Sequence, residues 1–234
     1  MKKVRTAAIV LAAGQGKRMG SGVPKQYLSI NEKPVIYYSL KVMEESDIDE
    51  VILVVGKDDM DYCREQIVDK YHFQKTKRII EGGSERYLSV YNGLCAIDNI
   101  DYVLIHDGAR PLIDKKLIAR TIEQVKKHQA CVVGMPVKDT IKIADENGMV
   151  ESTPVRDKVW MIQTPQAFNY LLIRNAYDTL MKEMISSVTD DAMVLEQIGG
   201  SSIKLIEGSY ENIKITTPED IQLAQLFLSK KSNL

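Results

Sequence analysis

Apolar runs typical of buried strands recur along the chain and alternate with segments of helical periodicity. Most of these runs contain Ala, Val, Ile and Leu without intervening polar residues, the pattern of a strand covered on both faces. The runs lie at residues 7–13, 51–55, 78–80, 102–106 and 131–135. Helical spacing of apolar residues is found at 34–45, from 86 onwards and at 115–128, and a more polar helix is expected at 59–70.

This alternation predicts an α/β fold, a single Rossmann-like domain in which a mostly parallel sheet carries helices on both faces. The 234 residues are enough for one such domain, so we expect residues 1–234 to form a single unit. Ligands bind these sheets at the carboxyl ends of the strands. The polar segments that follow strands, at 14–25, 82–86 and 107–111, are therefore expected to share one pocket.

The C-terminal third of the chain predicts further short elements. They are helices at 168–184 and 189–198, strands at 202–206 and 211–215, and a last helix from 217. Thr189 is the expected N-cap of the second helix. The last helix has a clear start signal, because Pro218 follows a capping Thr217 and is itself followed by two acids.

Between residues 136 and 164 the strand–helix alternation gives way to a hairpin pattern. Asn147-Gly148 separates two segments of alternating character, which is a strong signal for a two-residue turn. A two-stranded hairpin is not stable alone in water. We therefore expect this β-hairpin arm, residues 136–164, to pair with a second subunit in a homodimer.

Charge and cysteine content exclude several classes of protein. The 31 Lys and Arg residues balance the 32 Asp and Glu residues, so no basic field favours nucleic acid or an acidic membrane surface. No apolar run reaches the roughly 18 residues that are needed to span a bilayer. The 3 cysteines lie far apart and lack metal-ligand spacing, and a reducing cytoplasm is the expected location.

The turn after the first strand has the composition of a phosphate cradle. Its glycines allow backbone N–H groups to approach a ligand, and its cations suit a polyphosphate. The residues concerned are Gly14, Gly16, Gly20, Lys17, Arg18 and Lys25. The turn is neither a P-loop nor a dinucleotide fingerprint, because no Gly-Lys-Ser/Thr follows at the required spacing and position 19 is Met.

Two residues outside this turn are the main candidates for chemistry. Asp107 ends a buried strand and is a candidate Mg²⁺ ligand, since Mg²⁺ takes one or two carboxylates plus substrate phosphates; capping of the following turn is the alternative. Lys214 lies between two isoleucines, where a cation is costly unless it is paired or used. His106 is expected to pack at a strand end rather than act as a base. From its sequence neighbours alone, Arg156 is expected to form a surface ion pair with Asp157.

These residues favour nucleotidyl transfer over hydrolysis of a phosphate bond. A phosphate monoester needs no general base to become a nucleophile, because its second pKa is about 6. The protein then has to align that oxygen with the nucleotide α-phosphorus and spread the developing charge over Mg²⁺, Lys and Arg.

A series of motifs resembles the nucleotidyltransferases that activate sugar and polyol phosphates. The motifs are Leu11-Ala-Ala-Gly-x-Gly-x-Arg-Met19, Pro24-Lys25-Gln26-Tyr27-Leu28, Gly82-Gly-Ser-Glu-Arg86, His106-Asp-Gly-Ala-Arg-Pro111, Pro136-Val-Lys-Asp-Thr140, Gln163-Thr-Pro-Gln166 and Asn212-Ile-Lys214. In this order they are similar to the cytidylyltransferase family that acts on 2-C-methyl-D-erythritol 4-phosphate. The resemblance implies transfer of CMP from CTP to that polyol phosphate, with release of pyrophosphate, in non-mevalonate isoprenoid biosynthesis.

The resemblance also implies roles for individual residues. Arg18 and Lys25 would contact the triphosphate, and Lys214 would neutralise the α-phosphate during attack. Cytidine would be held by Ala12, Ala13, Gly14, Gly16, Gly83, Ser84 and Ser89, with Asp107 at the Mg²⁺ and ribose end. The polyol phosphate would be contacted by Arg110 and Thr189, and by Thr140, Arg156 and Thr164 from the partner subunit. Many family members carry Asp where this chain has Ser84, which leaves a side-chain contact to the base open.

Two alternatives remain at this point. Ribitol-5-phosphate cytidylyltransferase shares the expected fold, although Gly108-Ala109 and the segment 136–140 favour methylerythritol phosphate. A non-catalytic nucleotide-binding regulator would bind CTP without pyrophosphate release, and the retained cations argue against it. A nicotinamide-dependent dehydrogenase is weaker still, because the third glycine of its fingerprint is missing.

Overall fold

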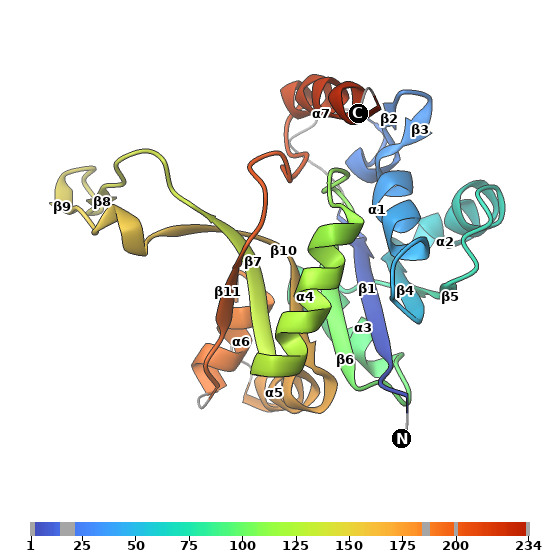
Figure 1. The fold of residues 1–234 in the computed structure, drawn as a ribbon, viewed down its shortest axis with the longest axis horizontal. Helices are drawn as coiled ribbons and strands as arrows, with labels where there is room; N and C mark the ends of the chain where they lie inside the picture. The colour runs from blue at the N-terminus through green and yellow to red at the C-terminus, as the bar shows by residue number, and fades with distance from the viewer. Residues whose placement is uncertain (1–2, 15–21, 184–187, 199–200, 233–234) are drawn as a thin grey trace.

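A seven-stranded sheet forms the centre of the computed structural model, which describes residues 3–14, 22–183, 188–198 and 201–232 (Figure 1). The strand order is β11-β7-β10-β6-β1-β4-β5. The strands are β1 (Thr6–Ala12), β4 (Glu50–Val55), β5 (Thr76–Glu81), β6 (Tyr102–Asp107), β7 (Ala130–Pro136), β10 (Trp160–Asn169) and β11 (Lys204–Glu207). Neighbours are parallel except where β10 pairs with β6 and β7. The predicted mostly parallel sheet is confirmed.

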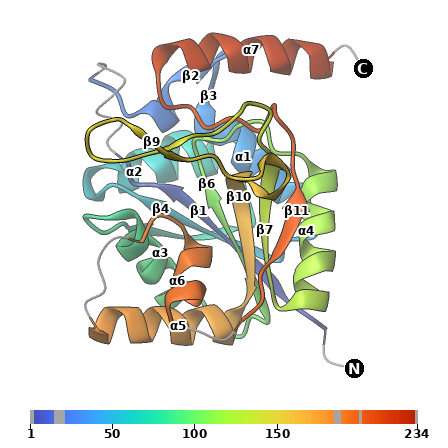
Figure 2. The same ribbon diagram turned by 90° about the vertical axis from the view of Figure 1, so that its left-hand side faces the viewer.

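Helices cover both faces of this sheet, as the apolar periodicity predicts. One face carries α1 (Val35–Glu44) and α4 (Lys115–His128), and the other carries α3 (Arg86–Cys95), α5 (Tyr170–Glu183) and α6 (Asp191–Ile198). Figure 2 shows α4 and α3 on opposite sides of the sheet. Residues of β1 alternate between the two cores, because successive side chains of a strand point to opposite faces: Val10 packs on one side and Ile9 on the other.

Smaller elements flank the sheet. The helix expected at 59–70 consists of three short turns, Lys57–Asp59, α2 (Met60–Tyr62) and the π-helical Cys63–Asp69. A 3₁₀ turn at Lys25–Tyr27 precedes the hairpin of β2 (Ser29–Ile30) and β3 (Lys33–Pro34). The last helix, α7 (Pro218–Ser232), packs over this hairpin through a separate apolar cluster. Among the described residues, no helix combines the length and apolar character that crossing a bilayer requires.

Three predictions of local structure are wrong. Strand β10 was not predicted, because residues up to 164 were assigned to the hairpin arm and a helix was expected from 168; α5 begins only after the strand. Residues 211–215 form a turn and an extended loop instead of a strand. The apolar spacing from position 86 groups Leu88, Tyr91 and Cys95 on one face of α3, but the buried face is formed one position away, by Ser89, Val90, Gly93 and Leu94.

The hairpin predicted between residues 136 and 164 is present as an arm. Its tip is formed by β8 (Ile143–Ala144) and β9 (Val150–Ser152), and Gly148 adopts a φ of 77° that suits a glycine in the turn. Figure 1 shows the arm extending away from the sheet, with β8 and β9 at its far end. Residues 138–153 are all exposed. This exposed part of the arm therefore makes few contacts with the rest of its own chain.

Candidate active site

Two pockets open at the carboxyl ends of the central strands. The first, which we call the loop pocket, has a volume of ≈ 570 Å³ and lies between the turn after β1 and the turn after β5. The second, the α6 pocket, has a volume of ≈ 500 Å³ and lies between β10 and the first turn of α6. Arg86, Asp107 and Lys214 line both pockets. These three residues thus form the wall that the pockets share.

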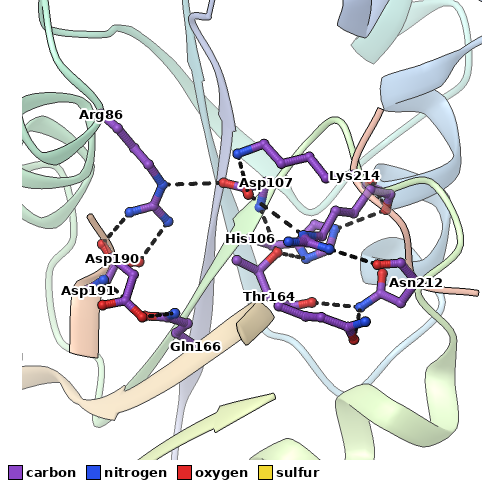
Figure 3. A network of polar contacts seen from close by, with 12 residues as sticks. Arg86, His106, Asp107, Thr164, Gln166, Asp190, Asp191, Asn212 and Lys214 are labelled. Carbon is purple, nitrogen blue, oxygen red and sulfur yellow. Dashed lines mark hydrogen bonds and ion pairs between the residues drawn. The ribbon is translucent and has the colours of Figure 1, made fainter. Parts of the chain in front are cut away.

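Asp107 is the centre of this wall. Its Oδ2 lies 2.9 Å from Nζ of Lys214 and 3.7 Å from Nε of Arg110, and its Oδ1 lies 3.4 Å from Nε of Arg86 (Figure 3). Burial alone would raise the pKa of the Asp107 carboxyl, but the three cations outweigh burial and hold that pKa well below its usual range. Asp107 is therefore an anion throughout the physiological pH range.

Arg86 is held from behind by a second carboxylate. Its Nη1 and Nη2 donate to Oδ1 and Oδ2 of Asp191 at 2.9 and 2.8 Å, and Asp191 is fully buried. Tyr177 donates a further hydrogen bond to Asp191 at 2.7 Å. Burial opposes the charge of Arg86, but Asp191 raises the pKa of its guanidinium above the usual value. The result is a bidentate pair, the geometry that a planar guanidinium favours.

Lys214 is positioned by the residues on either side of it. The buried Asn212 donates through Nδ2 to Oε1 of Gln163 at 3.2 Å and to the carbonyl of Thr164 at 2.9 Å. Ile215 is buried, and its N–H donates to the carbonyl of Ala109 at 2.8 Å. These bonds attach an irregular segment to β10 and to the turn after β6. The segment can therefore present Lys214 to the pockets without being a strand.

His106 packs at the end of β6, as the sequence predicts. One ring nitrogen lies 3.2 Å from the carbonyl of Arg110 and the other 3.0 Å from Oγ1 of Thr164. The same hydroxyl accepts from the backbone N–H of Asp107 at 3.0 Å. Burial lowers the pKa of His106 to about 4, so the imidazole is neutral at physiological pH. Both ring nitrogens are occupied and neither is placed to act as a base.

The loop pocket is built by close backbone approach. A side chain at Gly82 would collide with Cβ of Ala13, and one at Gly83 with Cβ of Leu88, so both positions need glycine. Ser89 accepts from the N–H of Gly83 at 3.0 Å and fixes the turn onto α3. The N–H of Gly82 donates to the carbonyl of Val55 at 2.8 Å, so both glycines are held within the chain and the shape of the turn is fixed before a ligand binds.

The structure brings most of the predicted site residues together. The loop pocket is lined by Ala12, Ala13, Gly14, Lys25, Gly83, Ser84, Ser89, Asp107 and Lys214, and the α6 pocket by Asp107, Arg110, Thr164, Thr189 and Lys214. Thr140 and Arg156 are exposed on the arm and line neither pocket. Gly16 and Arg18 lie outside the described residues.

Two expectations about these residues need correction. Thr164 was expected to act from the partner subunit, but it is buried next to Asp107 of its own chain and is not part of the arm tip. Thr189 was expected to cap α6, but Asp190 does so, because its Oδ1 accepts from the N–H of Met193 at 2.9 Å. Asp190 is in turn held by Gln166, whose Nε2 donates to it at 2.9 Å.

Sequence reasoning missed the residues that hold the shared wall in place. Arg86, Gln166 and Asn212 lie inside motifs quoted for the family resemblance, yet they were given no role. Asp191 was predicted only as part of the helix at 189–198. The one available signal was their place in the chain, because each of them lies two positions from a predicted site residue. Their partners lie far along the chain: Arg86 and Asp191 are separated by 105 positions.

Fold and site together define a class of enzyme. An α/β sheet carries Ala13 and Gly14 after β1 and Gly83 after β5, and two pockets meet there at a wall of paired charges. This is the arrangement of a nucleotidyltransferase, which has to bring a nucleotide and a phosphorylated acceptor into contact.

Comparison with known proteins identifies the family. The chain matches the family model described as 2-C-methyl-D-erythritol 4-phosphate cytidylyltransferase over residues 6–230. It is 52% identical over 228 residues to that enzyme of Lachnoclostridium phytofermentans, with 97% of each chain covered. It is also 52% identical over 223 residues to that of Lachnospira eligens, with 94% of this chain and 98% of the relative covered.

Solved structures agree with this assignment. The crystal structure of the 4-diphosphocytidyl-2C-methyl-D-erythritol synthase from Anaerococcus prevotii has a TM-score of 0.85 to this chain at 36% identity, covering 97% of this chain and 99% of that one. The cytidylyltransferase from Thermus thermophilus has a TM-score of 0.77 at 26% identity, with 97% and 100% covered. The chain belongs to the 2-C-methyl-D-erythritol 4-phosphate cytidylyltransferase family.

The buried His106 predicts a specific pH dependence of stability. Its pKa is about 4 in the folded chain, compared with 6.5 for a solvated imidazole. Between these values the unfolded state binds more protons, so stability is lost as the pH falls from about 6.5 towards about 4, by at most about 1.4 kcal/mol per pH unit. In urea unfolding at several pH values, His106→Gln should lose this contribution and show a shallower fall. His128→Gln, at an exposed helix end, is the matched control. Equal pH slopes for wild type and His106→Gln would contradict the assignment.

Proposed function

We infer that this chain catalyses the reaction of its family. It transfers CMP from CTP to 2-C-methyl-D-erythritol 4-phosphate, giving 4-diphosphocytidyl-2-C-methyl-D-erythritol and pyrophosphate in non-mevalonate isoprenoid biosynthesis. The observation that carries this conclusion is the shared wall: Arg86, Asp107 and Lys214 line both pockets. Two ligands placed in the two pockets would meet there.

We propose that the loop pocket takes CTP and the α6 pocket takes the polyol phosphate. The backbone of Ala12 to Gly14 and of Gly83, with Ser84 and Ser89, would hold cytidine, while Lys25 and Arg18 would contact the triphosphate. Arg110, Thr164 and Thr189 would contact the polyol phosphate. The α-phosphate and the attacking phosphate then both lie near Lys214, which supports its role in neutralising charge as the new bond forms.

The surroundings of His106 support attack without a general base. Both of its ring nitrogens have partners within the protein. A phosphate monoester is largely ionised near pH 7, because its second pKa is about 6. Catalysis then rests on alignment and on fixed positive charge.

We propose Mg²⁺ or another divalent cation as cofactor. Asp107 offers a hard oxygen donor to the loop pocket, and the described residues contain no cluster of three or more His, Cys, Asp and Glu that could hold a metal. A single carboxylate is sufficient for a cation that enters bound to the triphosphate, because Mg²⁺ takes most of its ligands from phosphates and water. When bound, the cation would neutralise the triphosphate and the leaving pyrophosphate.

We also propose that residues 1–234 act as one nucleotidyltransferase domain in the cytoplasm. All three cysteines are free thiols, and Cys63 and Cys131 are buried. Free cysteines are usual in a reducing compartment, where thiols are kept reduced.

The reaction and the role of Lys214 predict a specific assay result. With CTP and Mg²⁺, pyrophosphate should be released with methylerythritol phosphate and not with ribitol 5-phosphate. Lys214→Ala should lower kcat by on the order of 100- to 1,000-fold, as expected when one donor to developing charge is removed. Lys204→Ala, at an exposed strand position, is the matched control and should leave kcat unchanged.

Other outcomes of this assay would change the assignment. Pyrophosphate release with ribitol 5-phosphate and not with methylerythritol phosphate would show that the chain is a ribitol-5-phosphate cytidylyltransferase. CTP binding without release in either tube would indicate a nucleotide-binding regulator.

We propose that the arm forms a homodimer and completes the partner's site. Its apolar side chains are unusually exposed, with 67% of Met149, 61% of Val150 and 64% of Val155 accessible. An arm of this kind needs a partner surface, because a lone two-stranded hairpin is not stable in water. Thr140 and Arg156 on this arm would then contact the polyol phosphate held in the α6 pocket of the other subunit.

A mixing experiment tests this exchange between subunits. Lys214→Ala and Arg156→Ala homodimers should each be nearly inactive. After mixing and re-equilibration, a heterodimer has one site with both residues intact, so activity should rise to about a quarter of wild type for random pairing in a twofold dimer. Activity that stays at the level of the separate variants, or a pure monomer in sedimentation equilibrium, would contradict the proposal.

A further inference from the structure

The three cations around Asp107 are not equally free to move. The side chain of Lys214 is 36% exposed, whereas those of Arg86 and Arg110 are 28% and 11% exposed. Lys214 reaches the carboxylate with a single flexible ammonium, which can turn towards another anion. It is also the residue that the proposed reaction draws to the α-phosphate.

Departure of Lys214 would leave Asp107 in a costly position. The carboxylate side chain is only 10% exposed, and Lys214 is its closest cation. A buried carboxylate that loses a partner must gain another, move or take up a proton. The proposed cation would enter with the triphosphate and leave with the pyrophosphate, so a group of the protein itself has to keep the carboxylate in place throughout the reaction.

Arg86 is fixed in a way that suits this task. Its two terminal nitrogens are held by Asp191, which also accepts from Tyr177. The N–H groups of Asp191 and Ala192 both donate to Oε1 of Gln166 at 3.0 Å, which ties the start of α6 to β10. Because the guanidinium is planar, these bonds also fix the direction of Nε, which faces Asp107 (Figure 3).

We propose that Arg86 is a positioning residue: anchored on Asp191, it holds the Asp107 carboxylate in place when Lys214 leaves it for the substrate phosphate. The inference rests on the proposed function. It assigns Arg86 no contact with substrate, so its effect passes through Asp107. It also gives Asp191, which lies behind the wall and lines neither pocket, a place in catalysis.

The test compares two variants that break the anchor from opposite ends. Arg86→Lys keeps the positive charge but lacks the guanidinium that contacts Asp191 and Asp107 at the same time. Asp191→Asn keeps the shape of the side chain that holds Arg86 but removes its negative charge. Each should lower kcat by on the order of 10- to 100-fold, the effect of a misplaced reacting group. The Kd for CTP, measured by calorimetry, should stay within about twofold of wild type, because Asp191 lines neither pocket and Arg86→Lys keeps the positive charge at the pocket wall.

A double variant and a control complete the design. Arg86→Lys combined with Asp191→Asn should be no slower than the slower single variant, because both act through one contact. Arg174→Lys makes the same change in an arginine–aspartate pair on α5 that lines neither pocket, and should leave kcat unchanged. If Arg86→Lys does not fold, as judged by thermal unfolding, the isosteric Asp191→Asn decides the question.

Several results would overturn the inference. They are wild-type kcat in either variant, additive losses in the double variant, or weaker CTP binding in Arg86→Lys together with a normal Asp191→Asn. The last pattern would make Arg86 a direct ligand of the nucleotide. An inactive wild-type chain would instead refute the proposed function, so the two failures can be told apart.

Discussion

The Asp107 carboxylate, buried at the end of a central strand and surrounded by three cations, fixes the arrangement of the whole site. Its partners come from three different segments, the start of α3, the turn after β6 and the loop before α7. A carboxylate in this position keeps its charge only while such partners replace its lost hydration. The three segments are therefore held relative to one another by a single charge, and both pockets take their shape from it.

A buried network of this kind contributes more to geometry than to stability. Removing water from paired charges costs about as much as their attraction returns, so such pairs are weak evidence for a stable fold. They do fix positions, because breaking one pair leaves the other charge uncompensated. Here the positions are those of Lys214 and of the two pocket walls, so the same charges that order the loops prepare the site for two anionic ligands.

The sequence predicted the parts of this site that depend on local pattern. Apolar runs located β1 and β6, and the residues that follow them, such as Gly14 and Asp107, lie in the pockets as expected. Strand β10 was missed because its middle is Gln163-Thr-Pro-Gln166, which has neither an apolar run nor clean alternation. Lys214 was expected on a strand because Ile213 and Ile215 flank it, but those side chains pack into the apolar cluster that contains residues of α1, β2 and α7.

The partners of these residues could not be predicted, for a different reason. Arg86 and Asp191 meet only because the strand order places the ends of α3 and α6 together, and no local pattern encodes a contact over 105 positions. The N-cap of α6 shows the same limit on a smaller scale. Thr189 and Asp190 are both good capping residues, and the hydrogen bond from Gln166 on the distant β10 holds Asp190 in that position.

The most direct test of this account is a crystal structure of the chain with CTP and Mg²⁺. The account predicts that Nζ of Lys214 lies within hydrogen-bonding distance of an α-phosphate oxygen and has left Asp107, while Arg86 still joins Asp107 to Asp191. A structure in which Lys214 remains on Asp107 with CTP in the loop pocket, or in which Arg86 leaves Asp191 to bind the triphosphate, would contradict it.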